Sequence, residues 1–284
     1  MKKISAVIIL AALCTGLHAQ SVPFMVRGTD PRFMATGAVG TENLAATNAL
    51  SGKKLDAAAS YGINLSDTAT GIAGFNGYGN FGKLSVGLYG RYNMCAEYEM
   101  FNDRGRSLGA FKPSEMSVGA SVAYKITDKL AAGVRASYIS SKLSPDAAGS
   151  SVGIDVSAAY SNGALTAELA VRNLGQKIKY GDYEYALPSF AVAGVSYGTG
   201  GFKARAEAGY AFSGSFMAGL GAEYTFVKIV SLRAGFHYGD DTLVPTYASG
   251  GLGVQFAGVR LDATWCQPLG GGSGAILAGL GYSF

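Results

Sequence analysis

Charged side chains that alternate with apolar ones are the groups of this sequence that could most readily carry chemistry. In the run 259–265, Arg260 and Asp262 alternate with Leu261 and Trp265. Successive side chains of a strand point to opposite faces, so this run predicts a strand with one charged and one apolar face. Residues in the same kind of position form what we call the lumen charge network: Arg91, Arg135, Asp155, Glu168, Arg172, Lys203, Arg205, Glu207, Glu223, Arg233, Arg260 and Asp262.

Two interpretations of this network are open if the strands close into a barrel. The charges could line a transport path, or they could pair with one another as a polar interior. An enclosed charge needs a partner or water, and the two signs are nearly balanced. We therefore expect the charges to point inward and to pair, leaving no wide water channel.

Other reactive groups are few, and they do not predict an enzyme. His237 is the only histidine after residue 18. A hydrolase would need it beside a serine and a third orienting group, but no motif singles out a serine. Asp240 and Asp241 could attract Ca²⁺ together with Asp182 and Glu184, but no regular calcium loop is present. We expect no catalytic residue, no bound cofactor and no metal site.

The first residues of the chain predict export. Two lysines precede an apolar stretch from Ile4 to Leu13, and small residues follow up to Ala19. This is the pattern of a secretory signal peptide over residues 1–19, with cleavage expected after Ala19. Removal of the peptide leaves 21 basic and 19 acidic residues, a balance too even to predict binding to nucleic acid.

Two cysteines remain after that cleavage, Cys95 and Cys266. An oxidising exported compartment would permit a disulfide between them. Two free, partly buried thiols are the simpler interpretation, because the two residues fall on expected strands that are not neighbours.

Composition and periodicity together predict a membrane protein made of strands. Glycine accounts for 42 of 284 residues and charged residues for 15%, yet no later run approaches the ~18 apolar residues of a spanning helix. Alternating segments of about 9–11 residues suit a tilted spanning strand. Fourteen candidate segments are 55–63, 69–77, 83–92, 116–125, 130–140, 151–160, 164–173, 188–198, 201–211, 216–226, 230–238, 248–256, 259–266 and 275–284.

The expected fold is therefore all-β, a single transmembrane antiparallel up-and-down β-barrel over residues 55–284. Twelve strands is the main alternative, because the first two segments are the least regular. Residues 20–54 lack the strand pattern and are expected to form a periplasmic lead-in or an internal plug.

Short turns alternate with longer links between these segments, as they do between the periplasmic and external sides of bacterial barrels. The last segment ends on Tyr282 and Phe284, an aromatic ending that barrel assembly machinery commonly reads. These features predict the bacterial outer membrane as location, with outer-membrane lipid and the assembly machinery as partners.

Two long external links carry residues of the types enriched in protein interfaces. They could contact a partner, or they could fold into the barrel mouth and close it. Links 93–115 and 174–187 contribute the candidates Tyr98, Phe101, Arg104, Arg106, Phe111, Tyr180, Tyr183 and Tyr185.

Several motifs resemble the PorV/PorQ family of the Bacteroidetes outer membrane, whose fold is similar to FadL fatty-acid transporters. The stretch 117–124 with 130–135, and Gly153 to Val156, resemble its central hairpin and following strand. Arg172 to Gly175 followed by Leu187-Pro188 resembles its most recognisable pair. The late segments 249–254 and 261–262 also match, whereas Asn48 lacks the proline that usually follows it in the family.

The resemblance implies a FadL-like fold and an accessory role in type IX secretion, with secretion-system proteins or exported cargo as partners. The main functional expectation is thus a non-enzymatic barrel that binds partners in protein secretion. The alternative is a FadL-like transporter of hydrophobic small molecules, and a membrane hydrolase is a third class. A transporter requires an apolar pocket inside the barrel, whereas a partner-binding barrel requires exposed apolar groups on its external loops.

Overall fold

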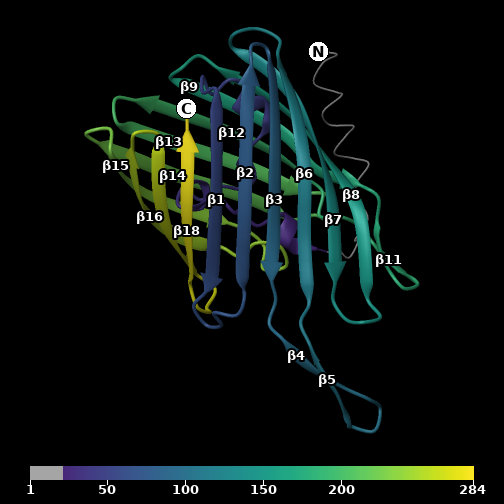
Figure 1. Cartoon of the computed structure of the whole chain (residues 1–284). Helices are drawn as coiled ribbons and strands as arrows, with labels where there is room; N and C mark the ends of the chain where they lie inside the picture. Colours follow the sequence, from purple (N-terminus) through teal and green to yellow (C-terminus); the bar gives the residue numbers. More distant parts are fainter. Residues whose placement is uncertain (1–21) are drawn as a thin grey trace.

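The computed structural model describes residues 22–284, so the expected signal peptide and its cleavage after Ala19 lie outside the described residues. Within them, fourteen antiparallel strands close into a single barrel (Figure 1). The predicted fold and its strand number are confirmed, and the twelve-strand alternative is wrong. The barrel strands are β1 (Leu55–Asn64), β2 (Gly71–Phe81), β3 (Leu84–Met94), β6 (Ser114–Lys125), β7 (Leu130–Lys142), β8 (Ala148–Ser161), β9 (Leu165–Gly175), β12 (Phe190–Thr199), β13 (Phe202–Ala211), β14 (Phe216–Phe226), β15 (Val230–Tyr238), β16 (Tyr247–Phe256), β17 (Val259–Pro268) and β18 (Ala275–Ser283).

The seam between the first and last strands completes the wall. β1 pairs with β18 from Asp56 opposite Ser283 to Asn64 opposite Ala275. Closure leaves no edge strand, so the backbone groups of the wall are satisfied without water.

The wall has an apolar outside and a polar inside. On β17, Leu261 and Trp265 are 58% and 52% exposed, whereas Arg260 and Thr264 are 4% and 2% exposed. An apolar outer surface is what a barrel presents to lipid. Apolar residues of this outer face include Val86, Leu88, Val118, Val122, Val134, Val152, Leu169, Leu220, Leu252 and Leu280.

The two ends of the barrel differ, and we name them by their connections. The turn end, at the top in Figure 1, carries the short turns between β2 and β3, β6 and β7, β8 and β9, β12 and β13, β14 and β15, and β16 and β17. Both the start of β1 and the end of β18 lie there. The loop end carries the remaining links, including two hairpins where the sequence predicts loops. These are β4 (Tyr98–Phe101) with β5 (Ser107–Phe111), and β10 (Ile178–Tyr180) with β11 (Tyr183–Tyr185).

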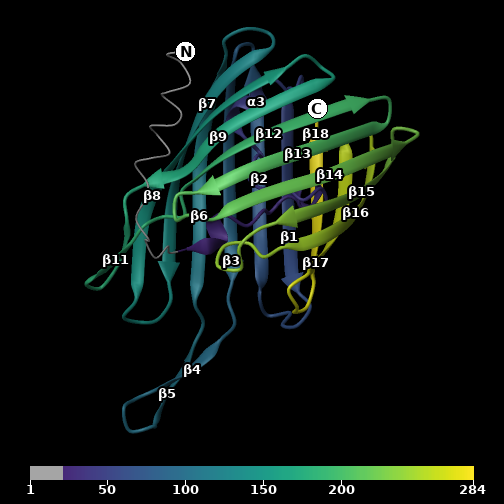
Figure 2. The same ribbon diagram turned by 180° about the vertical axis from the view of Figure 1, so that it is seen from behind.

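The N-terminal segment 22–54 lies inside the barrel, where Figure 2 shows it in purple behind the strands. It contains only short helical turns, η1 (Pro23–Met25), α2 (Pro31–Met34) and α3 (Ala45–Ala49). Alanines of α3 pack against Ala123, Ala131 and Ala159 of the wall. We call residues 22–54 the plug. No helix of the described chain is long and apolar enough to cross a membrane.

Glycine makes this close packing possible where the wall meets the plug. A Cβ atom added at Gly219 or Gly221 would collide with backbone atoms of Gly37 or Thr36. Part of the high glycine content therefore serves the approach of two backbones, which no larger residue permits.

Candidate functional site

The lumen charge network holds the plug in place. On β13, the Glu207 carboxylate accepts the N–H groups of Val39, Gly40 and Thr41 at 2.9, 3.0 and 3.2 Å. It also accepts the Thr41 hydroxyl at 2.6 Å and the Arg205 guanidinium at 2.9 Å. Backbone donors in an enclosed space must find acceptors, and this carboxylate supplies one for three consecutive residues.

Arginines of the wall donate hydrogen bonds to backbone carbonyl oxygens of the plug. On β3, Arg91 donates to the carbonyl oxygens of Phe24, Met25 and Arg27 at 3.2, 2.8 and 3.0 Å. It also lies 3.6 Å from Glu42 of the plug. Arg172 donates to the Gly40 carbonyl oxygen at 2.9 Å, and Arg135 donates to that of Asn43.

A cluster around Asp155 joins three wall strands. Its carboxylate lies 3.7 Å from Arg135 and 3.3 Å from Arg172, and it accepts the Asn173 N–H at 2.8 Å. The register of β8 and β9 shifts between Ile154 and Val156, and Asn173 has a positive φ of 57°. This irregularity turns the Asn173 backbone toward the carboxylate, which gives the motif 172–175 a physical role.

The remaining pairs lie nearer the turn end. Arg233 pairs with Glu223 and, at 2.7 Å, with Asp262. Arg260 pairs with Asp56 at 3.0 Å and with Asp262 at 3.7 Å. Arg205 also lies 3.9 Å from Glu168, whose carboxylate accepts the Thr47 hydroxyl of the plug at 2.7 Å.

Lys203 is the exception to the expectation that the network pairs. It faces Glu223 across the β13–β14 pair, but Arg233 occupies that carboxylate. In the described chain Lys203 has no ion pair, so the prediction of pairing is wrong for this residue.

Sequence reasoning missed the partners that the plug supplies. Asp30 accepts the Arg32 N–H at the start of α2 and forms an ion pair with its guanidinium at 2.6 Å. Burial alone would raise the pKa of Asp30, but the charge and hydrogen bonds of Arg32 more than offset this and lower it. Glu42 accepts the Thr29 and Asp30 N–H groups at 3.1 and 3.3 Å. The only available signal was charge in a segment without strand periodicity.

Two cavities lie on opposite sides of α2. The apolar pocket, at the loop end, has a volume of about 410 Å³ and is lined by residues far apart in sequence. Its lining includes Phe24, Met34, Ile72, Leu243, Val244, Tyr247, Cys266, Ala275 and Leu277, with Arg27 and Asp241 as charged members.

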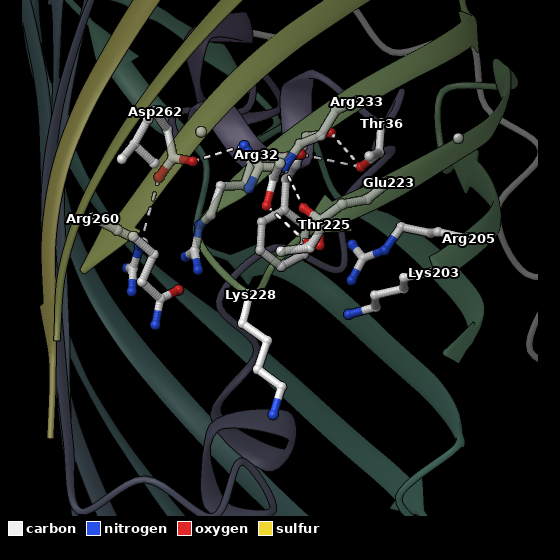
Figure 3. Close-up of a pocket in the computed structure, with 16 residues that line it drawn as sticks. Arg32, Thr36, Lys203, Arg205, Glu223, Thr225, Lys228, Arg233, Arg260 and Asp262 are labelled. Atoms are coloured by element: carbon white, nitrogen blue, oxygen red, sulfur yellow. Dashed lines mark hydrogen bonds and ion pairs between the residues drawn. The ribbon is translucent and has the colours of Figure 1, made fainter. Parts of the chain in front are cut away.

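The second cavity, the cationic pocket, lies at the turn end and has a volume of about 250 Å³. Figure 3 shows its charged side chains. Its lining carries Arg32, Lys203, Arg205, Lys228, Arg233 and Arg260 against Glu223 and Asp262. Met34 of α2 faces the apolar pocket while Arg32 and Phe33 face the cationic one, so α2 separates them.

His237 has no hydrolase geometry. Its ring is buried and stacks on Tyr247, with centroids 4.8 Å apart and planes 8° apart. No serine hydroxyl or carboxylate of residues 22–284 hydrogen-bonds to it. The same residues contain no group of three or more His, Cys, Asp or Glu side chains that could hold a metal.

The two cysteines of residues 22–284 are free thiols, Cys266 buried in the lining of the apolar pocket and Cys95 partly exposed after β3.

The candidate contact residues of the two long external links divide between exposure to a partner and closure of the barrel mouth. The β4–β5 hairpin projects away from the barrel (Figure 1), and Phe101 is 59% exposed. The alternative in which Phe101 folds into the barrel mouth is therefore wrong. Tyr98 packs on Phe111 within the hairpin, whose tip carries Arg104 and Arg106. By contrast, Tyr180 is buried with Phe24 and Ile139 over the mouth, whereas Tyr183 is exposed and Tyr185 partly buried.

The aromatic ending lies at the seam. Tyr282 faces outward, and the Phe284 carbonyl oxygen accepts the N–H groups of Lys54 and Leu55 at 2.8 and 3.0 Å.

No protein-family model and no curated protein matches the sequence. Solved structures share its fold. The toluene transporter TbuX of Ralstonia pickettii has a TM-score of 0.65 and 13% identity, over 92% of this chain and 99% of that one. The monoaromatic hydrocarbon channel CymD has a TM-score of 0.64 and 12% identity, over 94% and 99%. A Pseudomonas aeruginosa FadL homologue has a TM-score of 0.52 and 12% identity, over 91% and 94%.

These likenesses confirm the FadL-like fold that the sequence predicted. None of the comparisons points to the PorV/PorQ family, to type IX secretion or to Bacteroidetes. At such identities the comparison concerns the fold alone, and the closed fourteen-stranded barrel with a FadL-like fold is the conclusion that it carries.

Proposed function

We propose that this barrel is a non-enzymatic outer-membrane channel for small hydrophobic molecules. The observation that carries the proposal is the apolar pocket of about 410 Å³ inside the loop end. Apolar cavities of roughly 150 Å³ already admit benzene, and small-molecule sites are typically about 300–1,000 Å³. The structures with the same fold include proteins described as toluene transporters and a monoaromatic hydrocarbon channel.

The plug gives the proposed path its gate. An apolar molecule in this pocket meets α2 before it reaches the turn end, because α2 separates the two cavities. Buried hydrogen bonds fix this segment to the wall, so passage requires a rearrangement of the plug. A plug held in this way excludes water and ions while the barrel rests.

Filling the pocket should stop uptake. Ala275 lines it from β18, whereas Ala278 on the same strand faces outward. Ala275→Trp should reduce uptake of radiolabelled toluene by Gram-negative cells about tenfold, because the indole occupies the space that a ligand needs. Ala278→Trp should leave uptake unchanged.

Heat-modifiable gel migration would show that both variants assemble. If the assembled Ala275→Trp variant takes up toluene as fast as the parent protein, the apolar pocket does not lie on the path. That result would contradict the proposal.

A second candidate function rests on the projecting hairpin. Phe101 and Leu108 are 59% and 61% exposed on β4 and β5, beyond the barrel mouth. Exposed apolar groups of this kind mark contacts with other proteins. An accessory role in protein secretion of the type IX kind, with exported cargo or secretion-system proteins as partners, would use this surface.

Replacing residues 99–110 with a Gly/Ser link of equal length tests that role. The hairpin contributes nothing to the barrel sheet, so assembly and toluene uptake should survive. Co-purification of native-membrane partners should be lost. Tyr183→Ser on the other hairpin is the control that should retain them, and unchanged recovery with the Gly/Ser link would exclude the hairpin as the contact.

A further inference from the structure

The lining of the cationic pocket includes two lysines that take part in none of its ion pairs. Arg32, Arg205, Arg233 and Arg260 each have a carboxylate partner within 4 Å. Lys203 and Lys228 have none among residues 22–284. These two lysines are therefore the basic groups of the lining that remain available to a bound anion.

The two lysines line the cavity from different elements. Lys203 is on the inner face of β13, and Lys228 is on the turn between β14 and β15. In Figure 3 the charged ends of Lys203 and Arg205 point toward the same space, whereas the Lys228 side chain extends away from them. Gln255, Thr225 and Ser231 add polar groups to the lining.

The surrounding pairs keep the cavity preorganised. Arg233 is fixed by two carboxylates, and Arg205 stacks over the Phe33 ring at 4.2 Å while bonding Glu207. These fixed arginines define the walls of the cavity, so its shape does not have to form when an anion enters. A third cavity of about 350 Å³ shares Arg32, Phe33 and Lys203 with the cationic pocket. This cavity leaves room for an organic group attached to the anion.

From these observations we infer that the cationic pocket is a binding site for small oxyanions, the carboxylate or phosphate group of an organic molecule, with Lys203 and Lys228 as its free ligands. This site is distinct from the apolar pocket, since α2 lies between them. It gives the turn end a selectivity for charge that the loop end lacks.

The test uses inorganic phosphate and butyrate as probes, titrated calorimetrically into the full-length protein in neutral detergent at low salt. We expect at least one of them to bind. The double variant Lys203→Gln/Lys228→Gln should bind that probe at least about tenfold more weakly, because hydrogen bonds from charged groups are stronger than those from neutral ones.

The control is Lys83→Gln/Lys129→Gln, which removes the same charge from two exposed turn positions at the same end of the barrel. It should bind as the parent protein does. Phosphate binding that depends on Lys203 and Lys228 identifies a phosphate site, and butyrate binding identifies a carboxylate site. Binding of neither probe, or an equal loss in both double variants, would overturn the inference. The proposed channel function is tested separately by Ala275→Trp, because Ala275 lines the apolar pocket and not the cationic one, so failure of either proposal can be told from failure of the other.

Discussion

Glu207→Gln should release the plug and turn a closed barrel into a conducting pore. One carboxylate oxygen faces three backbone N–H donors, and the other faces the Thr41 hydroxyl and the Arg205 guanidinium. A glutamine places an NH₂ group against donors in either orientation. Removing one member of a buried charge pair typically costs about 3–5 kcal/mol, and here the loss falls on the bonds that hold residues 39–41.

Planar-bilayer recordings would measure the effect. The parent protein should show no large steady conductance, whereas Glu207→Gln should raise the mean conductance about tenfold, because a fourteen-stranded barrel lies between filled eight-stranded and open 16–18-stranded barrels. Glu223→Gln is the matched control, since the ion pair of Glu223 among residues 22–284 is with Arg233 of the wall and not with the plug. Equal conductance in the parent protein and both variants would show that Glu207 does not retain the plug.

Asp155→Asn should give the largest loss of stability among single changes in the wall. The carboxylate neutralises Arg135 and Arg172, which are 5% and 3% exposed. The neutral amide leaves two buried guanidinium groups without their partner and also weakens the acceptor for the Asn173 N–H. We expect the free energy of unfolding to fall by about 3–5 kcal/mol.

Urea unfolding followed through Trp265, the only tryptophan, measures this loss, because unfolding transfers its exposed outer-face ring from detergent to water. Asp128→Asn, in the exposed turn between β6 and β7, should leave the midpoint unchanged. If Asp155→Asn also unfolds at the parent midpoint, the three-strand cluster is not a stabilising element.

Period-two alternation was enough to predict the strands and their faces. Arg260 and Leu261 fall on the expected sides because side-chain direction alternates strictly along a strand. The hairpin β4–β5 escaped prediction because its strands of four and five residues are too short for period-two alternation to be recognised. The glycines opposite the plug could not be interpreted from sequence, because their role depends on a second backbone, that of Thr36 and Gly37, lying against them.

The candidate sites depend on distant contacts that no local pattern contains. The apolar pocket joins Met34, Leu243 and Leu277, which only the closed barrel brings together. Lys203 and Arg233 both lie opposite Glu223 in neighbouring strands. Strand register alone does not decide which of them forms the ion pair. Alternation predicts which charged residues of the wall face inward. It does not predict their partners in the plug, because residues 22–54 have no strand periodicity.

The position of the plug also constrains the order in which the protein can be built. Residues 22–54 lead directly into β1, and their bonds reach strands from β3 to β17. The last strand, β18, closes the wall against β1 through nine residue pairs. We do not expect a segment bonded to so many strands to be threaded into a finished cylinder. We expect it to settle among the open strands first, so that pairing of the chain's last strand seals a compartment already filled by its earliest part.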